Sequence, residues 1–178
     1  MRLLGLIAAC TLWLTNSSSA CAQSRLSDCQ KQDIETLTTQ LVKDLPNYTN
    51  RVNQKSRRLT RSIDIYSYVL VAGKAEFAPL SLGHGEYLPT LPVAEQPQQV
   101  FITTLERQYT SGKLVQLQQY HWLFMTQTNS GWRLAFMFSR TGTYPNKQPP
   151  TPPRESSNGA ISQAVNTWLR DCQAGTLR

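Results

Sequence analysis

The sequence is poor in the groups that most enzymes use for catalysis. Only two histidines occur among its 178 residues, and no C-x-x-C pair is present. It contains no G-x-S-x-G elbow, no phosphate-binding glycine loop, no H-E-x-x-H motif and no close pair of carboxylates in an aromatic setting. The sequence therefore predicts no catalytic residue, no metal site and no cofactor, and it favours a protein that is not an enzyme.

Long apolar runs are also scarce. The longest, Leu3–Leu14, has 12 residues, which is well short of the roughly 20 that a membrane-spanning helix needs. Arg2 precedes this run and the small residues Ala20 and Ala22 follow it, an arrangement typical of a secretory signal peptide. We therefore expect residues 1–22 to be removed, leaving a chain without a transmembrane helix that is exported to the periplasm or the extracellular space.

The number of cysteines bears on where the signal peptide ends. Cleavage after Ala22 leaves only Cys29 and Cys172, an even pair that an oxidising compartment would join as a disulfide. A lipid anchor on Cys21 is the alternative, but Ser18 stands where a bulky aliphatic residue is usual in a lipoprotein signal. A Cys29–Cys172 disulfide would serve as a structural clasp, because redox-active pairs are usually closely spaced.

The rest of the chain, residues 23–178, reads as one α+β domain. Apolar residues at three- and four-residue steps predict a helix over Asp28–Leu45, capped by Ser27 or Asp28 and ended by Pro46, and a second helix over Gly159–Gln173. Ser156, Ser157 or Asn158 is the expected cap of the second helix, and Gly175 suits its end. Runs rich in β-branched and aromatic residues predict the strands Ser62–Val71, Gln99–Tyr109, Lys113–Thr128 and Trp132–Arg140, with a short one near Ala75–Ala78.

Glycine-containing turns separate the last three strands, so we expect consecutive hairpins in a curved antiparallel meander of four to five strands. Lys113–Thr128 is long enough to require strong twist or a bulge. In the last strand, alternation places Trp132, Leu134, Phe136 and Phe138 on one face and Ala135 and Met137 on the other. Residues 141–158 form a proline-rich crossover, and the overall pattern is analogous to cystatin-like and nuclear-transport-factor-like folds.

A cluster of cations stands out in a chain that carries 18 Lys and Arg against 11 Asp and Glu. Its five members lie within residues 51–61 with no acidic residue among them: Arg51, Lys55, Arg57, Arg58 and Arg61. The cluster could bind an anionic envelope surface or a protein partner. A solvated strand or loop that serves solubility accounts for the same residues, and nucleic acid is an improbable ligand for an exported protein without a nucleic-acid motif.

Aromatic residues on the expected strands suggest a second kind of site. His121, with Tyr120 and Trp122 beside it, would be the principal polar group of a pocket inside the curved sheet. Such a pocket would suit a small-ligand carrier or a hydrolase, whereas ordinary core packing accounts for the same side chains. This alternative predicts a cavity with His121 at its wall.

Four segments carry a resemblance to a known family. They are Tyr66–Gly73, Gln118–Phe124, Gly131–Leu134 and Trp168–Cys172. Together they resemble a family of exported cyanobacterial proteins of unknown function. The resemblance implies a Gram-negative type of envelope, and hence a periplasm or an equivalent lumen, but it transfers no activity and no site.

Overall fold

The protein is an α+β domain in which two helices cover one face of an open sheet. The structure, a computed structural model, describes residues 29–60, 65–78, 96–110, 113–142 and 149–177. The expected signal peptide, Cys21 and Arg61 lie outside these residues. After a helical turn at 29–31, the elements are α2 (Ile34–Thr60), β1 (Ile65–Val71), β2 (Gln98–Thr110), β3 (Lys113–Thr128), β4 (Gly131–Thr141), β5 (Arg154–Glu155) and α3 (Ala160–Gln173).

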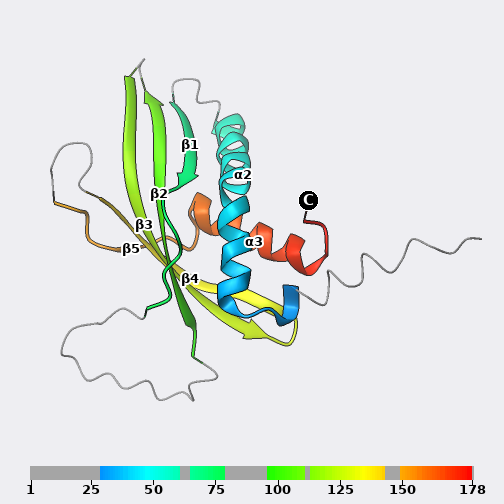
Figure 1. Cartoon of the computed structure of the whole chain (residues 1–178). Coiled ribbons are helices and arrows are strands. Elements are labelled where there is room, and N and C mark those ends of the chain that lie inside the picture. The colour runs from blue at the N-terminus through cyan, green and yellow to red at the C-terminus, as the bar shows by residue number, and fades with distance from the viewer. Residues whose placement is uncertain (1–28, 61–64, 79–95, 111–112, 143–148, 178) are drawn as a thin grey trace, which may run out of the picture.

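The five strands are antiparallel and follow one another in the order β1-β2-β3-β4-β5. The sheet curves around α2, and α3 crosses on the same side (Figure 1). Residues near Glu76 extend the sheet by a single bridge to Phe101, at the place where a short strand was expected. The α+β class and the antiparallel meander predicted from the sequence are confirmed.

Helix α2 is longer than the sequence pattern indicates. It begins after Asp33, whose Oδ1 accepts a 2.8 Å hydrogen bond from the Thr36 backbone N–H, and it continues through Pro46 to Thr60. The predicted end at Leu45 was therefore wrong, and the predicted caps, Ser27 and Asp28, lie outside the described residues. A proline removes one helical hydrogen bond, but the apolar stripe of α2 continues beyond it, because Tyr48 and Val52 pack against the core that Leu45 helps to form.

A β-bulge interrupts the pairing of β3 with β4. Phe124 pairs with Phe136 and Met125 with Leu134, so Ala135 has no partner. The extra residue reverses the alternation along β4: Trp132 and Met137 are buried against the helices, whereas Phe136 is 37% exposed on the outer face. The bulge confirms the expectation of an irregular long hairpin, but the prediction that Trp132 and Phe136 share a face was wrong.

The core lies between the inner face of the sheet and the two helices. Trp168 of α3 is fully buried and donates a 2.9 Å hydrogen bond from Nε1 to Asp44 Oδ2 of α2. Trp132 donates in the same way to the Gln32 carbonyl, at 2.9 Å. Both indoles thus bury their apolar rings in the core while their N–H groups are hydrogen-bonded.

The two ends of α3 differ in how they are held. Its N-cap is Gly159, which makes no side-chain capping bond, so the prediction of a serine or asparagine cap was wrong. The hydroxyl of Ser162 instead donates back to the carbonyl of Ser157. At the other end Gly175 adopts φ 66°, the left-handed conformation that favours glycine after a helix, as predicted.

Cys29 and Cys172 form the predicted disulfide, with their Cα atoms 5.8 Å apart. Both are buried, and the bond links the helical turn before α2 to the last turn of α3. It spans a sequence separation of 143 residues, so it constrains nearly the whole folded chain.

We expect the double variant Cys29→Ser/Cys172→Ser to unfold at lower denaturant concentration than the wild type. Cross-linking a loop of this length is worth on the order of 4 to 5 kcal/mol in the chain-entropy model. Denaturant unfolding followed by tryptophan fluorescence measures the difference, and reduced wild-type protein should match the double variant. Equal midpoints for the oxidised and reduced wild type would contradict the expectation.

Candidate binding site between the sheet and the helices

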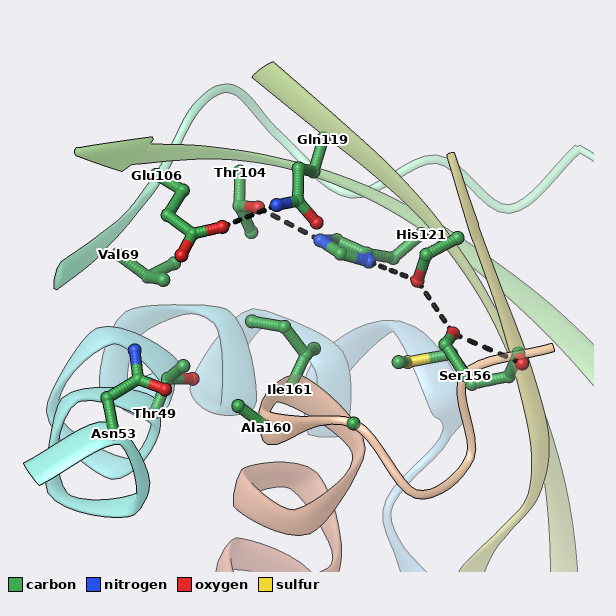
Figure 2. Close-up of a pocket in the computed structure, with 13 residues that line it drawn as sticks. Thr49, Asn53, Val69, Thr104, Glu106, Gln119, His121, Ser156, Ala160 and Ile161 are labelled. Carbon is green, nitrogen blue, oxygen red and sulfur yellow. Dashed lines mark hydrogen bonds between the residues drawn. The ribbon is translucent and has the colours of Figure 1, made fainter. Parts of the chain in front are cut away.

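A cavity of about 210 Å³ lies where α2 and α3 separate beneath the sheet. The sheet supplies one wall, including Glu106 and His121, and the helices supply the other with Thr49, Asn53 and the first turn of α3 (Figure 2). Apolar side chains complete the lining, among them Val69, Met137 and Ile161.

His121 is held in the cavity wall by hydrogen bonds at both ring nitrogens. Thr104 Oγ1 lies 2.9 Å from Nε2, and Ser139 Oγ lies 2.7 Å from Nδ1. The chain continues from Ser139 Oγ to Ser156 Oγ at 2.7 Å, and Ser156 Oγ donates to the Met137 carbonyl at 3.3 Å (Figure 2).

These four hydrogen bonds can form together in only one direction. Because a carbonyl only accepts, the Ser156 proton points to Met137, so Ser139 donates to Ser156 and accepts from His121 Nδ1–H. His121 Nε2 then accepts from Thr104. In this arrangement the imidazole is not placed as a base for Ser139, so the network favours positioning over nucleophilic catalysis.

Burial keeps His121 neutral. The side chain is 1% exposed, and desolvation lowers the pKa of His121 from 6.5 to about 4 because burial penalises the imidazolium ion. The cavity wall at this point is therefore an uncharged, fully hydrogen-bonded surface at neutral pH.

Glu106 supplies a carboxylate to the same wall. Its Oε1 accepts from Ser67 Oγ at 2.7 Å and from Gln108 Nε2 at 3.1 Å, and its Oε2 accepts from Gln119 Nε2. A carboxylate offers about four acceptor positions. The three donors found in the described part of the chain therefore leave one position on Glu106 for a further donor.

The helical wall is less completely paired. Thr49 is fully buried, and its Oγ1 has no hydrogen-bond partner within the part of the chain that the structure describes. Among the described residues, Asn53 reaches the sheet through a long bond of 3.4 Å from Nδ2 to Ser67 Oγ. One turn earlier, Asn50 bonds both the N–H and the carbonyl of Val69, so α2 is fixed against the edge strand β1.

A wider groove of about 790 Å³ runs between the second half of α2 and α3. Arg51, Lys55 and Arg170 line it, and no acidic residue occurs among the described residues that line it. Asn53 and Ala160 line both the groove and the cavity, so the two spaces adjoin.

The predicted basic cluster lies on a helix and is divided by the fold. Arg51, Lys55, Arg57 and Arg58 are all exposed on α2, so these four side chains are solvated as the solubility alternative expected, but on a helix rather than on a strand or loop. Arg51 and Lys55 line the groove, whereas Arg57 and Arg58 occupy the last turn of α2, where cations complement the negative end of the helix dipole.

The predicted pocket residues are also divided. His121 lines the cavity, but its strand neighbours Tyr120 and Trp122 point to the outer face of the sheet. There Phe101 lies 5.3 Å from Trp122 between ring centroids, and Arg140 lies over Tyr120 and Trp122. Neighbouring residues on a strand face opposite ways, so all three could not share one pocket.

Several residues of the site were missed by sequence reasoning: Thr49, Asn53, Glu106, Gln119, Ser139, Ser156 and Arg170. Strand alternation was a usable signal for Gln119, because it precedes His121 by two residues and so shares its face. No signal in the sequence places Thr49 beneath the sheet or Arg170 beside Arg51 and Lys55, since these positions depend on how the helices cross. Among the described residues no group of three metal-binding side chains occurs and no helix could span a membrane.

The depressed pKa of His121 predicts a pH dependence of stability. The unfolded chain takes up the proton near pH 6.5 and the folded protein only near pH 4, so stability is complete above pH 6.5 and falls as the pH decreases towards 4. The loss at pH 4 amounts to about 3 kcal/mol.

Urea unfolding of the wild type and of His121→Asn at pH 7 and pH 4 measures this effect. The asparagine variant keeps a polar side chain at this position and all the carboxylates that titrate over the same pH range, but it lacks the imidazole. Its free energy of unfolding should therefore fall by about 3 kcal/mol less than that of the wild type between pH 7 and pH 4. An equal decline in both proteins would show that His121 does not titrate as its burial requires.

Comparison of the chain with protein-family models, with curated proteins and with solved structures finds no match. The resemblance to exported cyanobacterial proteins, and the analogies to cystatin-like and nuclear-transport-factor-like folds, therefore rest on the sequence pattern alone. Because a fold does not by itself assign an activity, the function of this protein has to be inferred from the chemistry of its groove and cavity.

Proposed function

We propose that the protein is a non-enzymatic binding module that holds an anionic envelope surface against the groove between α2 and α3. The observation that carries this proposal is the position of Arg51, Lys55 and Arg170, three cations from two helices that line one groove. A surface of clustered negative charge, such as phospholipid headgroups or an acidic polysaccharide, complements such a groove.

The charges of the groove are available to a ligand. Arg51 and Lys55 are exposed, and the guanidinium of Arg51 rests 5.0 Å above the ring of Tyr48. Arg170 makes a 3.6 Å ion pair with Asp171, but its side chain is 74% exposed, so water screens that pair strongly. Asp171 also accepts a 3.0 Å hydrogen bond from the Tyr48 hydroxyl, and it lies in an adjoining pocket rather than among the residues that line the groove.

The expected export of the chain supports an envelope component as the partner. A protein released beyond the inner membrane meets anionic headgroups and acidic polymers, whereas it seldom meets nucleic acid. A protein partner with an acidic surface would use the same cations. The buried disulfide fits an oxidising compartment as well.

The double variant Arg51→Gln/Lys55→Gln tests the groove. We expect wild-type protein to bind dextran sulfate and phosphatidylglycerol vesicles at low ionic strength, and to be released as salt is added. Each cation near such a surface contributes about 1 kcal/mol, so the double variant should bind about 30-fold more weakly. Vesicle co-sedimentation and polymer-binding titrations measure the loss.

A matched control separates the groove from net charge. Lys113→Gln/Arg133→Gln removes the same two charges from exposed positions on β3 and β4 that do not line the groove, and it should change binding less than about two- to three-fold, the residual effect of net charge alone. Equal losses of binding affinity in the two double variants would show that binding depends on net charge and not on the groove. The proposal fails if the wild type binds neither probe at low ionic strength.

A further inference from the structure

The buried hydroxyl of Thr49 is the first sign that the cavity beneath the sheet is built for a ligand. A threonine inside a helix can bond to a carbonyl of the preceding turn, yet Thr49 Oγ1 has no partner within the described residues, although the side chain is fully buried. An unpaired buried hydroxyl is destabilising. The group lines the cavity (Figure 2), where a bound molecule could satisfy it.

The first turn of α3 is the second sign. Gly159, Ala160 and Ile161 line the same cavity, and the helix runs away from the sheet from this point (Figure 2). The N–H groups of a first turn point towards the helix N-terminus and have no partner within the helix. Gly159 provides no side-chain cap, so the positive end of the helix dipole faces the cavity.

An uncapped helix N-terminus beside an unpaired hydroxyl is suited to an anion. The helix has 14 residues, enough for an effective dipole, and Thr49 approaches from a different helix. The cationic groove adjoins the cavity at Asn53 and Ala160. Arg51 and Lys55 would therefore attract an anion to the entrance.

The opposite wall restricts which anion can enter. Glu106 places a carboxylate there with one acceptor position still open, and His121 beside it has a depressed pKa and no charge at neutral pH. A phosphate or sulfate dianion would be repelled by Glu106. A molecule with one negative end and a hydrogen-bond donor at the other end would be complementary to both walls.

The volume limits the size of the molecule. A cavity of about 210 Å³ corresponds to about seven water molecules at their share of the liquid. This is smaller than most drug-sized sites and fits a compact molecule of a few carbon atoms.

From these features we infer that the cavity binds a small monocarboxylic acid that also carries a hydrogen-bond donor, as amino acids and hydroxy acids do. The carboxylate accepts from Thr49 Oγ1 and from the first turn of α3, and the amine or hydroxyl donates to Glu106. This site is distinct from the groove and does not depend on the binding of an anionic surface there.

Calorimetric titration with four small probes tests the chemistry of the site. Glycine and lactate each carry a carboxylate and a donor, acetate carries only the carboxylate, and ethanolamine carries only the donor end. We expect glycine or lactate to bind about ten-fold or more tightly than both acetate and ethanolamine, because each of these lacks one of the two charge-assisted hydrogen bonds. The inference is overturned if neither glycine nor lactate binds, or if acetate binds as tightly as they do.

The variant Thr49→Val removes the hydroxyl with little change of shape. Loss of a hydrogen bond to a charged group should weaken binding of the better probe about ten-fold or more. Thr39→Val is the matched control, because Thr39 lies on the exposed side of the same helix with its hydroxyl bonded to the Glu35 carbonyl. Unchanged affinity in Thr49→Val would refute the assignment.

Two further measurements separate ligand binding at Thr49 from a purely structural role of its hydroxyl. Without ligand, Thr49→Val should melt at the same temperature as the wild type or higher, since it loses an unpaired buried group. In the wild type, addition of glycine or lactate should shift the amide resonances of Ala160 and Ile161, a result that requires no variant to fold.

Thr49→Val should bind dextran sulfate like the wild type, so a failed groove proposal and a failed cavity proposal give different results.

Discussion

The position of α3 is the constraint on which both the cavity and the groove depend. Its last turn is fixed by the disulfide and by Gln173, which donates a 2.9 Å hydrogen bond to the Trp132 carbonyl. Its first turn is fixed because the preceding Ser156 and Ser157 bond the backbone of Met137 at 2.8 and 3.0 Å. Trp168, buried between these ends, fills the crossing with α2. The helix therefore ends in a packed core and begins at the edge of a cavity.

The bulge at Ala135 determines what faces that cavity. If the same sequence formed a regular strand without a bulge, burial of Trp132 would place Ser139 on the outer face, because side chains alternate with a period of two. With the bulge, Met137 and Ser139 face the helices. Ser139 can then accept from His121 and continue the hydrogen bonds to the segment before α3. A single backbone irregularity thus links the sheet, a buried imidazole and the start of a helix.

The sequence predicts well those features that local patterns encode. Alternation and turn residues located β3 to the residue, and cysteine parity identified the disulfide. The errors arose where distant packing overrides a local rule. Pro46 indicates a helix end by its missing N–H, but the apolar stripe of α2 carries the helix past it. The alternation of inward and outward side chains along β4 is reversed at the bulge, and no local sequence pattern indicates a bulge at that position. Thr49 has no distinguishing context in the sequence, because its significance arises only when α3 begins opposite it.

Folding determines which parts of the surface the cations of this protein occupy. In the sequence, five cations form one cluster, yet on α2 the pair Arg51 and Lys55, one turn apart, lines the groove while Arg57 and Arg58 occupy the helix end. The third cation that lines the groove is Arg170, which is remote in sequence from the cluster. The cavity beneath the sheet carries the opposite charge on its sheet side, because Glu106 lines it there. An anion drawn in by the groove, as proposed, would meet the positive end of α3 first and the Glu106 carboxylate beyond it, so the charge at the far end of the ligand would set how deeply it binds.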